Sequence, residues 1–404
     1  MDGWLLSKVL IVGAAMGGLR TAESLRRFGY SGEITIVGGE KHLPYNRPPL
    51  SKDLLAQGKD FDAVAFPIKD SELKAEFILA DPATSLSCHE KRIYLASGRN
   101  LEYDYLVAAT GLRSRQMHFP NNLKLGRYNL RTFDDAKAIG AAATPEKKVV
   151  ILGAGFIGLE LAATLRALGC SVAIVALEAI PLSPILGDDF GLAVQKRHEK
   201  EGVQFHLNRS VQDLIGDQKI SGVLLSDGEI LECDLLIEAV GSQTNTEWLE
   251  GNNLDIGNGV LTDNSLRAMR IDKSRVEDLF VVGDIARFPY VNIALPARRI
   301  EHWNIPVECG KRVGREIAAK EGSKSSSDLK QDEHFNPLPS FWSDQFSISI
   351  LSYGEPKIAD TISLLEGSLD SEFIFEYRRE GSVVAVAGIG MRRKISALRE
   401  EIRL

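Results

Sequence analysis

The sequence is poor in cysteine, and its four cysteines are far apart. Cys88, Cys170, Cys233 and Cys309 form no CxxC pair and match no zinc or iron–sulfur spacing. Nothing in this arrangement indicates a framework of disulfides or a metal site. We therefore expect buried, apolar thiols in a protein of the reducing cytoplasm.

Long hydrophobic runs and a concentration of one charge are also missing. The longest apolar stretch, residues 9–19, is too short and too rich in glycine to span a bilayer. The first residues read MDGWLLSK and lack the basic segment of a signal peptide. The 48 basic and 55 acidic residues give a net charge of −7, which argues against nucleic acid as the main partner. With 44% hydrophobic and 25% charged residues, the 404-residue chain is typical of a globular protein of two or three domains.

Two segments, residues 8–40 and 148–178, share one pattern. Each has an apolar run, a glycine cluster, a helical stretch, a glycine near the end of that stretch, and a second apolar run. Short runs rich in Val and Ile predict buried parallel strands. Gly29 and Gly169 stand where a helix should end. Each segment is therefore predicted to be a βαβ unit.

The second glycine cluster is a complete GxGxxG formed by Gly153, Gly155 and Gly158. In such a turn the first glycine allows the tight bend, the second lets the backbone approach a pyrophosphate, and the third lets the helix pack on the strand. The phosphates then lie at a helix N-terminus. The cluster predicts a dinucleotide site, although a GxGxxG alone can also be an ordinary loop.

The first cluster, residues 13–18, is incomplete because Ala15 replaces the central glycine between Gly13 and the Gly17–Gly18 pair. One added methyl group still leaves room for a slightly displaced pyrophosphate. Glu40 ends the next predicted strand, where a carboxylate accepts hydrogen bonds from an adenosine ribose; the alternative is a solvated loop acid. Two dinucleotide sites imply two cofactors, and a flavin with a nicotinamide is the simplest pair.

Further motifs follow in the order of a known family. They read PYNRPPLSK (44–52), ATG (109–111), NLRTFDDA (129–136), VGDIA (282–286), EHW (301–303) and FWSDQ (341–345). With the two glycine clusters, they resemble the FAD-dependent NAD(P)H:ferredoxin reductases of bacterial oxygenase and P450 systems, such as putidaredoxin and rubredoxin reductases. The resemblance implies an α/β, glutathione-reductase-like fold with two Rossmann-type domains. It places the FAD domain at 1–111 and 242–321, the NAD(P)H domain at 112–241, and a C-terminal α+β domain at 322–404.

The resemblance also implies roles for individual residues around the FAD. The residues expected to contact it are Gly13, Gly17, Gly18, Glu40, Arg47, Ala83, Arg131, Asp284, Glu301, His302 and Trp303. Of these, Asp284 would bind the ribityl chain, and the last three would border the isoalloxazine. The helix predicted over 306–319 would direct its positive end at the flavin, where it favours the anion of the reduced ring.

For the nicotinamide nucleotide, the resemblance implies a site lined by Gly153, Gly155, Ile157, Gly158 and Gly241. Lys52 would lie near the flavin and pair with Glu160, which gives a tunable cation beside the ring. The alternative for Glu160 is an ordinary helix acid.

One position departs from the NAD-preferring members of the family. They end the second strand of the nicotinamide unit with an acid, and here that position is Ala176. Glu178 follows two residues later and would contact the ribose of the nucleotide; the alternative is a simply exposed acid. No Arg or Lys stands between Ala176 and Gly187 to attract a 2′-phosphate. The sequence therefore favours NADH over NADPH.

The family's dithiol relatives carry a CxxxxC pair close to residues 41–52, where this chain has no cysteine. Electrons therefore cannot leave through a disulfide, and the resemblance implies single-electron transfer to a [2Fe–2S] ferredoxin that serves an oxygenase or cytochrome P450. Basic residues that could attract an acidic ferredoxin are Arg298, Arg299, Lys311, Arg312 and Arg315, with Trp342 near the flavin edge. A solvated face is the alternative for each charge. The alternative functions are an apoptosis-inducing-factor-like NADH-binding protein and a rubredoxin reductase.

Overall fold

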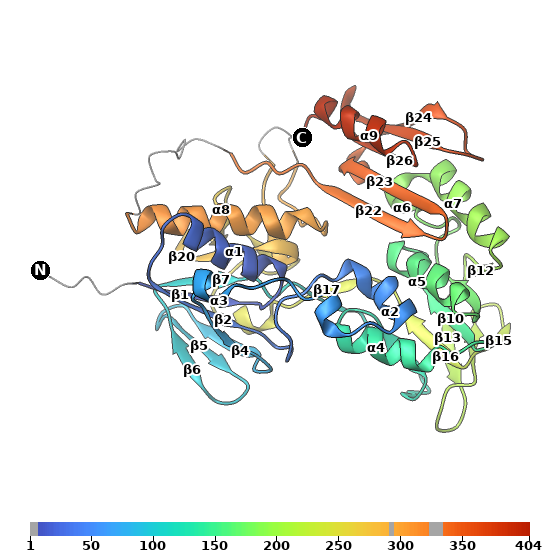
Figure 1. Ribbon diagram of the computed structural model, residues 1–404, viewed down its shortest axis with the longest axis horizontal. Helices are drawn as coiled ribbons and strands as arrows, with labels where there is room; N and C mark the ends of the chain where they lie inside the picture. The colour runs from blue at the N-terminus through green and yellow to red at the C-terminus, as the bar shows by residue number, and fades with distance from the viewer. Residues whose placement is uncertain (1–6, 291–294, 323–333) are drawn as a thin grey trace, which may run out of the picture.

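The computed structural model describes residues 7–290, 295–322 and 334–404. It contains two mainly parallel sheets covered by helices and a third, antiparallel sheet formed by the C-terminal part of the chain (Figure 1). The α/β class with two nucleotide-binding units is confirmed. No helix within these ranges is both long enough and apolar enough to cross a membrane.

The first sheet has the strand order β19-β20-β7-β1-β2-β3. Its strands are β1 (Lys8–Val12), β2 (Glu33–Val37), β3 (Glu76–Ile78), β7 (Tyr105–Ala108), β19 (Arg267–Met269) and β20 (Arg275–Val281). The last two come from a segment that follows the second sheet in sequence, so the chain leaves this sheet and returns to it. The helix α1 (Met16–Arg27) ends just before Gly29, which has φ +87°.

The second sheet repeats this design with the order β12-β11-β10-β16-β9. Its strands are β9 (Arg127–Asn129), β10 (Lys148–Leu152), β11 (Ser171–Val175), β12 (Gln204–His206) and β16 (Leu235–Glu238). The strand β10 is buried at four of its five residues and leads into α5 (Phe156–Ala167). Gly169, with φ +86°, follows that helix. Both predicted βαβ units are therefore present.

The third sheet is antiparallel, with the order β22-β23-β26-β25-β24. Its strands are β22 (Ser340–Gln345), β23 (Ile348–Gly354), β24 (Thr361–Gly367), β25 (Phe373–Arg379) and β26 (Ser382–Ile389), followed by α9 (Arg392–Leu398). The strand β22 packs on α5 of the second sheet, as Figure 1 shows. The predicted linker at 322–334 lies almost entirely outside the described residues.

The remaining elements cover these sheets or connect them. They are α2 (Asp53–Gln57), α3 (Asp70–Leu73), α4 (Phe133–Ala142), α6 (Ser183–Leu186), α7 (Asp188–Lys200), α8 (Asn304–Lys320), β4 (Ala83–Ser87), β5 (Arg92–Leu95), β6 (Asn100–Glu102), β8 (Leu112–Ser114), β13 (Val211–Ile215), β14 (Gly222–Leu225), β15 (Ile230–Glu232), β17 (Ser242–Thr244), β18 (Val260–Leu261) and β21 (Ala286–Arg287). The strands β8 and β17 pair antiparallel where the chain passes between the first two sheets.

The helix α8 lies against α1 at close range (Figure 1). A Cβ atom on Gly314 would come within 2.5 Å of the Ser24 Cβ. The Ser24 hydroxyl donates a hydrogen bond of 2.9 Å to the carbonyl of Lys311. This contact fixes the direction of α8, whose first turn borders the site described next.

Candidate dinucleotide and electron-transfer site

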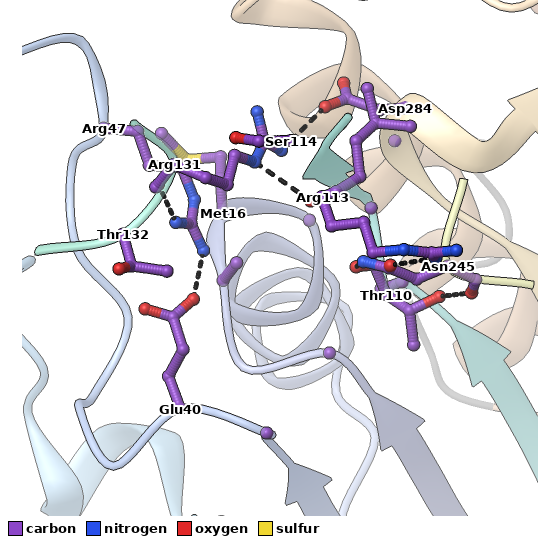
Figure 2. A pocket seen from close by; sticks show the side chains of 18 of the residues that line it. Met16, Glu40, Arg47, Thr110, Arg113, Ser114, Arg131, Thr132, Asn245 and Asp284 are labelled. Atoms are coloured by element: carbon purple, nitrogen blue, oxygen red, sulfur yellow. Dashed lines mark hydrogen bonds and ion pairs between the residues drawn. The ribbon is translucent and has the colours of Figure 1, made fainter. Parts of the chain in front are cut away.

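A cavity of about 1190 Å³ lies where the carboxyl ends of β1, β2, β7 and β20 meet α5 and α8. This edge of a parallel sheet is where α/β proteins bind ligands. The predicted residues that line it are Gly13, Gly17, Glu40, Arg47, Ala83, Arg131, Ile157, Glu160, Asp284, Glu301, His302 and Trp303. Figure 2 draws the side chains of 18 lining residues and labels ten of them, among which Glu40 lies beside Arg47 and Asp284 beside Arg131.

The first glycine cluster forms a turn that is packed too tightly for side chains. Gly13 has φ +134°, and a Cβ atom there would come within 2.1 Å of the Ala109 carbonyl oxygen. A Cβ on Gly17 would meet Val282 at 2.8 Å. Ala15 caps α1 in an extended conformation, so the structure accepts its methyl group. The turn thus brings the start of α1 against the cavity, where its free N–H groups favour a phosphate.

Glu40 lies in a half-buried polar cluster beside this turn. Its carboxylate accepts hydrogen bonds of 2.6 Å from Arg47 Nη2 and of 2.6 Å from the Tyr45 hydroxyl. Arg47 also donates to the carbonyl of Arg131 at 2.6 Å. Burial raises the pKa of Tyr45, so its hydroxyl keeps the proton that it donates. The ion pair appears at the left of Figure 2 and holds the Glu40 carboxylate at the edge of the cavity.

Asp284 lies on the opposite side of the same cavity. Arg131 Nη2 is 3.3 Å from its carboxylate, and Arg299 donates to its main-chain carbonyl at 2.9 Å. Burial raises the pKa of Asp284, and Arg131 opposes this shift. Arg131 is itself oriented by a 3.0 Å hydrogen bond to the carbonyl of Leu112. The arrangement presents a carboxylate at a strand end, suited to sugar hydroxyls.

Lys52, just before α2, and Glu160, on α5, are brought together from distant parts of the chain. Lys52 Nζ is 2.7 Å from Glu160 Oε1, and only 6% of Glu160 is exposed. The same carboxylate accepts hydrogen bonds from the Ser51 hydroxyl at 2.5 Å and the Ser343 hydroxyl at 2.6 Å. Lys52 does not itself line the cavity, whereas Glu160 and Ser51 do. A buried carboxylate that accepts from three donors is held in one orientation.

The three residues of the EHW motif differ in their surroundings. Glu301 is exposed and pairs with Arg299 at 2.9 Å. His302 is packed edge-on against Phe341, and its buried Nδ1 atom has no hydrogen-bond partner among the described residues. Burial lowers the pKa of His302 to about 4, with a smaller contribution from Lys357. The imidazole is therefore neutral near pH 7, and its unpartnered nitrogen suits a polar atom of a ligand in the cavity.

Trp303 forms the rim of the cavity. It is 40% exposed, and its indole N–H donates to the side-chain oxygen of Asn46 at 3.1 Å. Its ring meets that of Trp342 edge to face, with 5.6 Å between centroids. The pair joins the motif EHW to the C-terminal motif FWSDQ.

The second glycine cluster leaves an open cradle at one position. A Cβ on Gly153 would come within 2.5 Å of the Ala239 oxygen, and one on Gly158 within 2.1 Å of the Gly153 oxygen. A Cβ on Gly155 would meet no atom within 4 Å. This is the space through which a backbone approaches a pyrophosphate. Ile157 is 46% exposed and faces the cavity, so the cradle and the cavity are neighbours.

The remaining predicted nucleotide residues lie outside the cavity lining. Gly18 packs against Gly13 in the first turn, with no room for a Cβ atom. Gly241 has φ +94° with open space around it, at the end of the second sheet. Glu178 is exposed in the loop after β11, close to the main chain of Asn208.

The predicted basic cluster is largely paired with acids. Arg298 makes a two-pronged ion pair with Glu355, and its side chain is 19% exposed. The Arg299 and Arg312 side chains are also mostly covered, the latter beside Glu316. Arg315 lies half-buried on the same helix. Lys311 is different because its head is 54% exposed, although it pairs with Glu308 at 2.8 Å.

Some residues of the site were not identified from the sequence. Ser51 and Ser343 lie inside the motifs RPPLSK and FWSDQ, but a serine in a motif gives no sign of the carboxylate that it meets. Arg209 lies beside Ala176, because its main-chain N–H donates to the Ala176 carbonyl at 3.0 Å. Its guanidinium contacts Asp227 and Glu229. No spacing rule connects this group to the end of β11.

Comparison with known proteins agrees with this geometry. The family model described as "Pyridine nucleotide-disulphide oxidoreductase" matches residues 7–310. The chain is 29% identical to a probable ferredoxin reductase, CtmF, of Castellaniella defragrans, over 94% of this chain and 89% of that protein. It is 27% identical to human apoptosis-inducing factor 3, over 98% of this chain and 62% of that protein. The structure is similar to the covalent putidaredoxin reductase–putidaredoxin complex, with a TM-score of 0.89, 26% identity, and coverage of 98% of this chain and 92% of that chain.

The neutral state of His302 gives a prediction for pH dependence. Its pKa of about 4 lies below the ordinary 6.5, so the unfolded chain binds this proton more readily than the folded protein does. Stability is therefore lost as the pH falls from 6.5 towards 4, by at most ~1.4 kcal/mol per pH unit. In histidine-labelled protein, the His302 NMR signal, assigned by its loss in H302N, should not titrate between pH 5.5 and 9. A titration midpoint of the His302 signal near pH 6.5 would contradict the burial argument. The matched control for the assignment is H89N, which removes an exposed histidine and should leave the His302 signal in place.

Proposed function

Because the chain belongs to the pyridine nucleotide-disulphide oxidoreductase family, we propose that it is an NADH-dependent ferredoxin reductase with tightly bound FAD. The observation that carries the proposal is the Lys52–Glu160 pair, which stands between a cavity and a glycine cradle of the kinds that bind two dinucleotides. No cysteine is among the described residues that line the cavity. A dithiol relay is therefore not the exit route, and the electrons pass to a second protein.

When bound, the FAD would supply the redox chemistry. It would take up a hydride from NADH and pass the two electrons one at a time to two ferredoxin molecules, with one proton released to solvent. The residues of this chain bind the cofactor and the nucleotide and orient them toward each other. Glu40 and Asp284 would hold the ribose and the ribityl chain of the FAD. Glu160, which lines the cavity, would hold the Lys52 cation just behind the cavity wall. Holding the two rings in contact can lower the barrier by about 7–11 kcal/mol. The first turn of α8 adds a positive dipole at the same place.

The proposed partner is a [2Fe–2S] ferredoxin that delivers electrons to an oxygenase or a cytochrome P450, in the cytoplasm. The similarity to the putidaredoxin reductase–putidaredoxin complex supports a ferredoxin, and the rim formed by Trp303 and Trp342 supports an exit there. The match to apoptosis-inducing factor 3 keeps an NADH-binding role as the second candidate. We keep the proposed domain division, with the FAD part at 1–111 and 242–321.

The preference for NADH has an electrostatic basis in the loop beside Ala176. Ala176 donates to the His206 carbonyl at 3.1 Å and accepts from Arg209 at 3.0 Å, so both residues flank the proposed ribose position. Arg209 is neutralised by Asp227 at 2.9 Å and Glu229 at 2.5 Å. Two carboxylates therefore face one guanidinium, and the His206 ring lies 3.1 Å from Arg209 Nη1 in the same group. Such a group disfavours a 2′-phosphate, whereas a 2′-hydroxyl tolerates it.

The proposed activity is tested by anaerobic stopped-flow reduction. The purified yellow protein should lose its flavin absorbance with NADH at least tenfold faster than with NADPH, and should then reduce a [2Fe–2S] ferredoxin repeatedly. Colourless protein that does not take up added FAD would overturn the proposal. Rapid bleaching by NADH without electron transfer to any ferredoxin or rubredoxin would favour the apoptosis-inducing-factor-like role.

The docking proposal concerns Lys311, which lies eight residues from Trp303, about 12 Å along α8. The K311E variant should lower the second-order rate of ferredoxin reduction severalfold at low salt and leave ferricyanide reduction unchanged, because only the acidic partner senses the reversed charge. The control is K320E, the same change about 26 Å from Trp303. Equal losses with both acceptors, or an equal effect of K320E, would refute the docking position.

The nucleotide preference is tested by neutralising the two acids that face Arg209. In the D227N/E229Q variant, the Kd for NADP⁺ measured by calorimetry should fall about tenfold, while the Kd for NAD⁺ changes less than threefold. Neutralisation at Glu232, at the far end of the same β14–β15 hairpin, is the control. An NADP⁺ affinity that does not respond to the double change would exclude this explanation.

A further inference from the structure

The strand β22 of the C-terminal sheet reaches the proposed hydride-transfer site. Ser343, in the middle of β22, is 1% exposed, and its hydroxyl lies 2.6 Å from Glu160 Oε1. That oxygen is also the one that contacts Lys52 Nζ. Glu160 therefore receives donors from the first sheet's domain and from the C-terminal sheet.

The direction of the Ser343 hydrogen bond is set by a second residue. Gln345, two residues along β22, donates its side-chain N–H to the Ser343 oxygen at 2.9 Å. Because Gln345 occupies that oxygen as an acceptor, the single hydroxyl proton of Ser343 is directed to the carboxylate. The chain Gln345 → Ser343 → Glu160 is thus a polarised relay of hydrogen bonds, all in buried surroundings.

The second oxygen of the Glu160 carboxylate, Oε2, is also fixed by a hydrogen bond. Ser51 donates to Glu160 Oε2 at 2.5 Å, and the main-chain carbonyl of Ser51 accepts from the Thr164 hydroxyl at 2.6 Å. Thr164 lies one turn after Glu160 on α5. The loop that carries Lys52 is therefore tied to the same helix as the acid that pairs with Lys52.

We propose that Ser343, held by Gln345, is a positioning residue that orients Glu160 for its contact with Lys52, so that the C-terminal sheet completes the hydride-transfer site. This inference rests on the proposed function for its kinetic test. Without Ser343, Oε1 loses one of its two donors and the carboxylate can rotate about its side chain, away from the geometry that Lys52 requires. If Ser343 has this role, the hydride-transfer site depends on the C-terminal sheet, which contributes no residue to either glycine cluster.

The hairpin β22–β23 supplies a matched control for this proposal. Ser349 donates to the carboxylate of Asp344 at 2.6 Å, so it makes the same kind of bond as Ser343 in the same hairpin. That bond is exposed and does not involve Glu160. Substituting alanine at the two positions removes one hydroxyl–carboxylate bond each, and only one of these bonds lies at the proposed site.

The experiment compares S343A with S349A in FAD-loaded protein by anaerobic stopped flow. A lost hydrogen bond to a buried charge predicts that S343A lowers the limiting rate of flavin reduction by NADH about tenfold. S349A should match the parent within twofold. An S343A rate equal to that of S349A would overturn the inference. If the proposed function itself fails, the parent and both variants alike show no reduction by NADH.

A second measurement needs no activity. The proposal predicts that S343A lowers the free energy of unfolding in urea less in an E160A background than in the parent, because the hydroxyl then has no carboxylate to orient. S349A should cost the same in both backgrounds. Additive effects of S343A and E160A, both on unfolding and on the limiting rate, would show that Ser343 merely supports the C-terminal sheet.

Discussion

The packing of the three sheets around the cavity depends on one buried carboxylate, that of Glu160. Glu160 lies on α5 almost out of contact with water, and a carboxylate in that position is strongly unfavourable unless donors surround it. Lys52, Ser51 and Ser343 provide those donors, from segments separated by more than a hundred residues of sequence. The two nucleotide-binding sheets and the C-terminal sheet must therefore pack in one relative arrangement for this acid to be satisfied. The same arrangement creates the cavity that α5, α8 and the strand ends enclose.

A large part of this fold could be predicted from the sequence, because its signals are local. The strand–glycine–helix periodicity of residues 8–40 and 148–178 gave both βαβ units, since tight turns leave no room for Cβ atoms at Gly13 and Gly153. The pairing of Lys52 with Glu160 came from the family resemblance and not from spacing. Their 2.7 Å contact joins two domains and has no local signature.

The parts that escaped prediction depend on tertiary contacts. Arg298 reads as a surface charge in a basic run, yet Glu355, more than fifty residues away in the chain, covers it. At Ala176 the sequence favoured NADH only because no Arg or Lys follows nearby. It held no sign of the hairpin whose Asp227 and Glu229 pair with Arg209 beside Ala176. Ser343 belongs to a recognised motif, but only the packing of β22 on α5 shows what its hydroxyl contacts.

The shared donors of Glu160 have a consequence for modularity. Nucleotide-binding domains are commonly exchanged between enzymes as self-contained units, but this one carries an acid whose partners belong to its neighbours. If the domain of the second sheet were separated from the rest, this acid would be exposed or left without donors. A transplanted copy would need a host protein that supplies a lysine and two serines at matching places. The exchange of a whole domain would therefore leave Glu160 without donors unless the neighbouring domains supplied them.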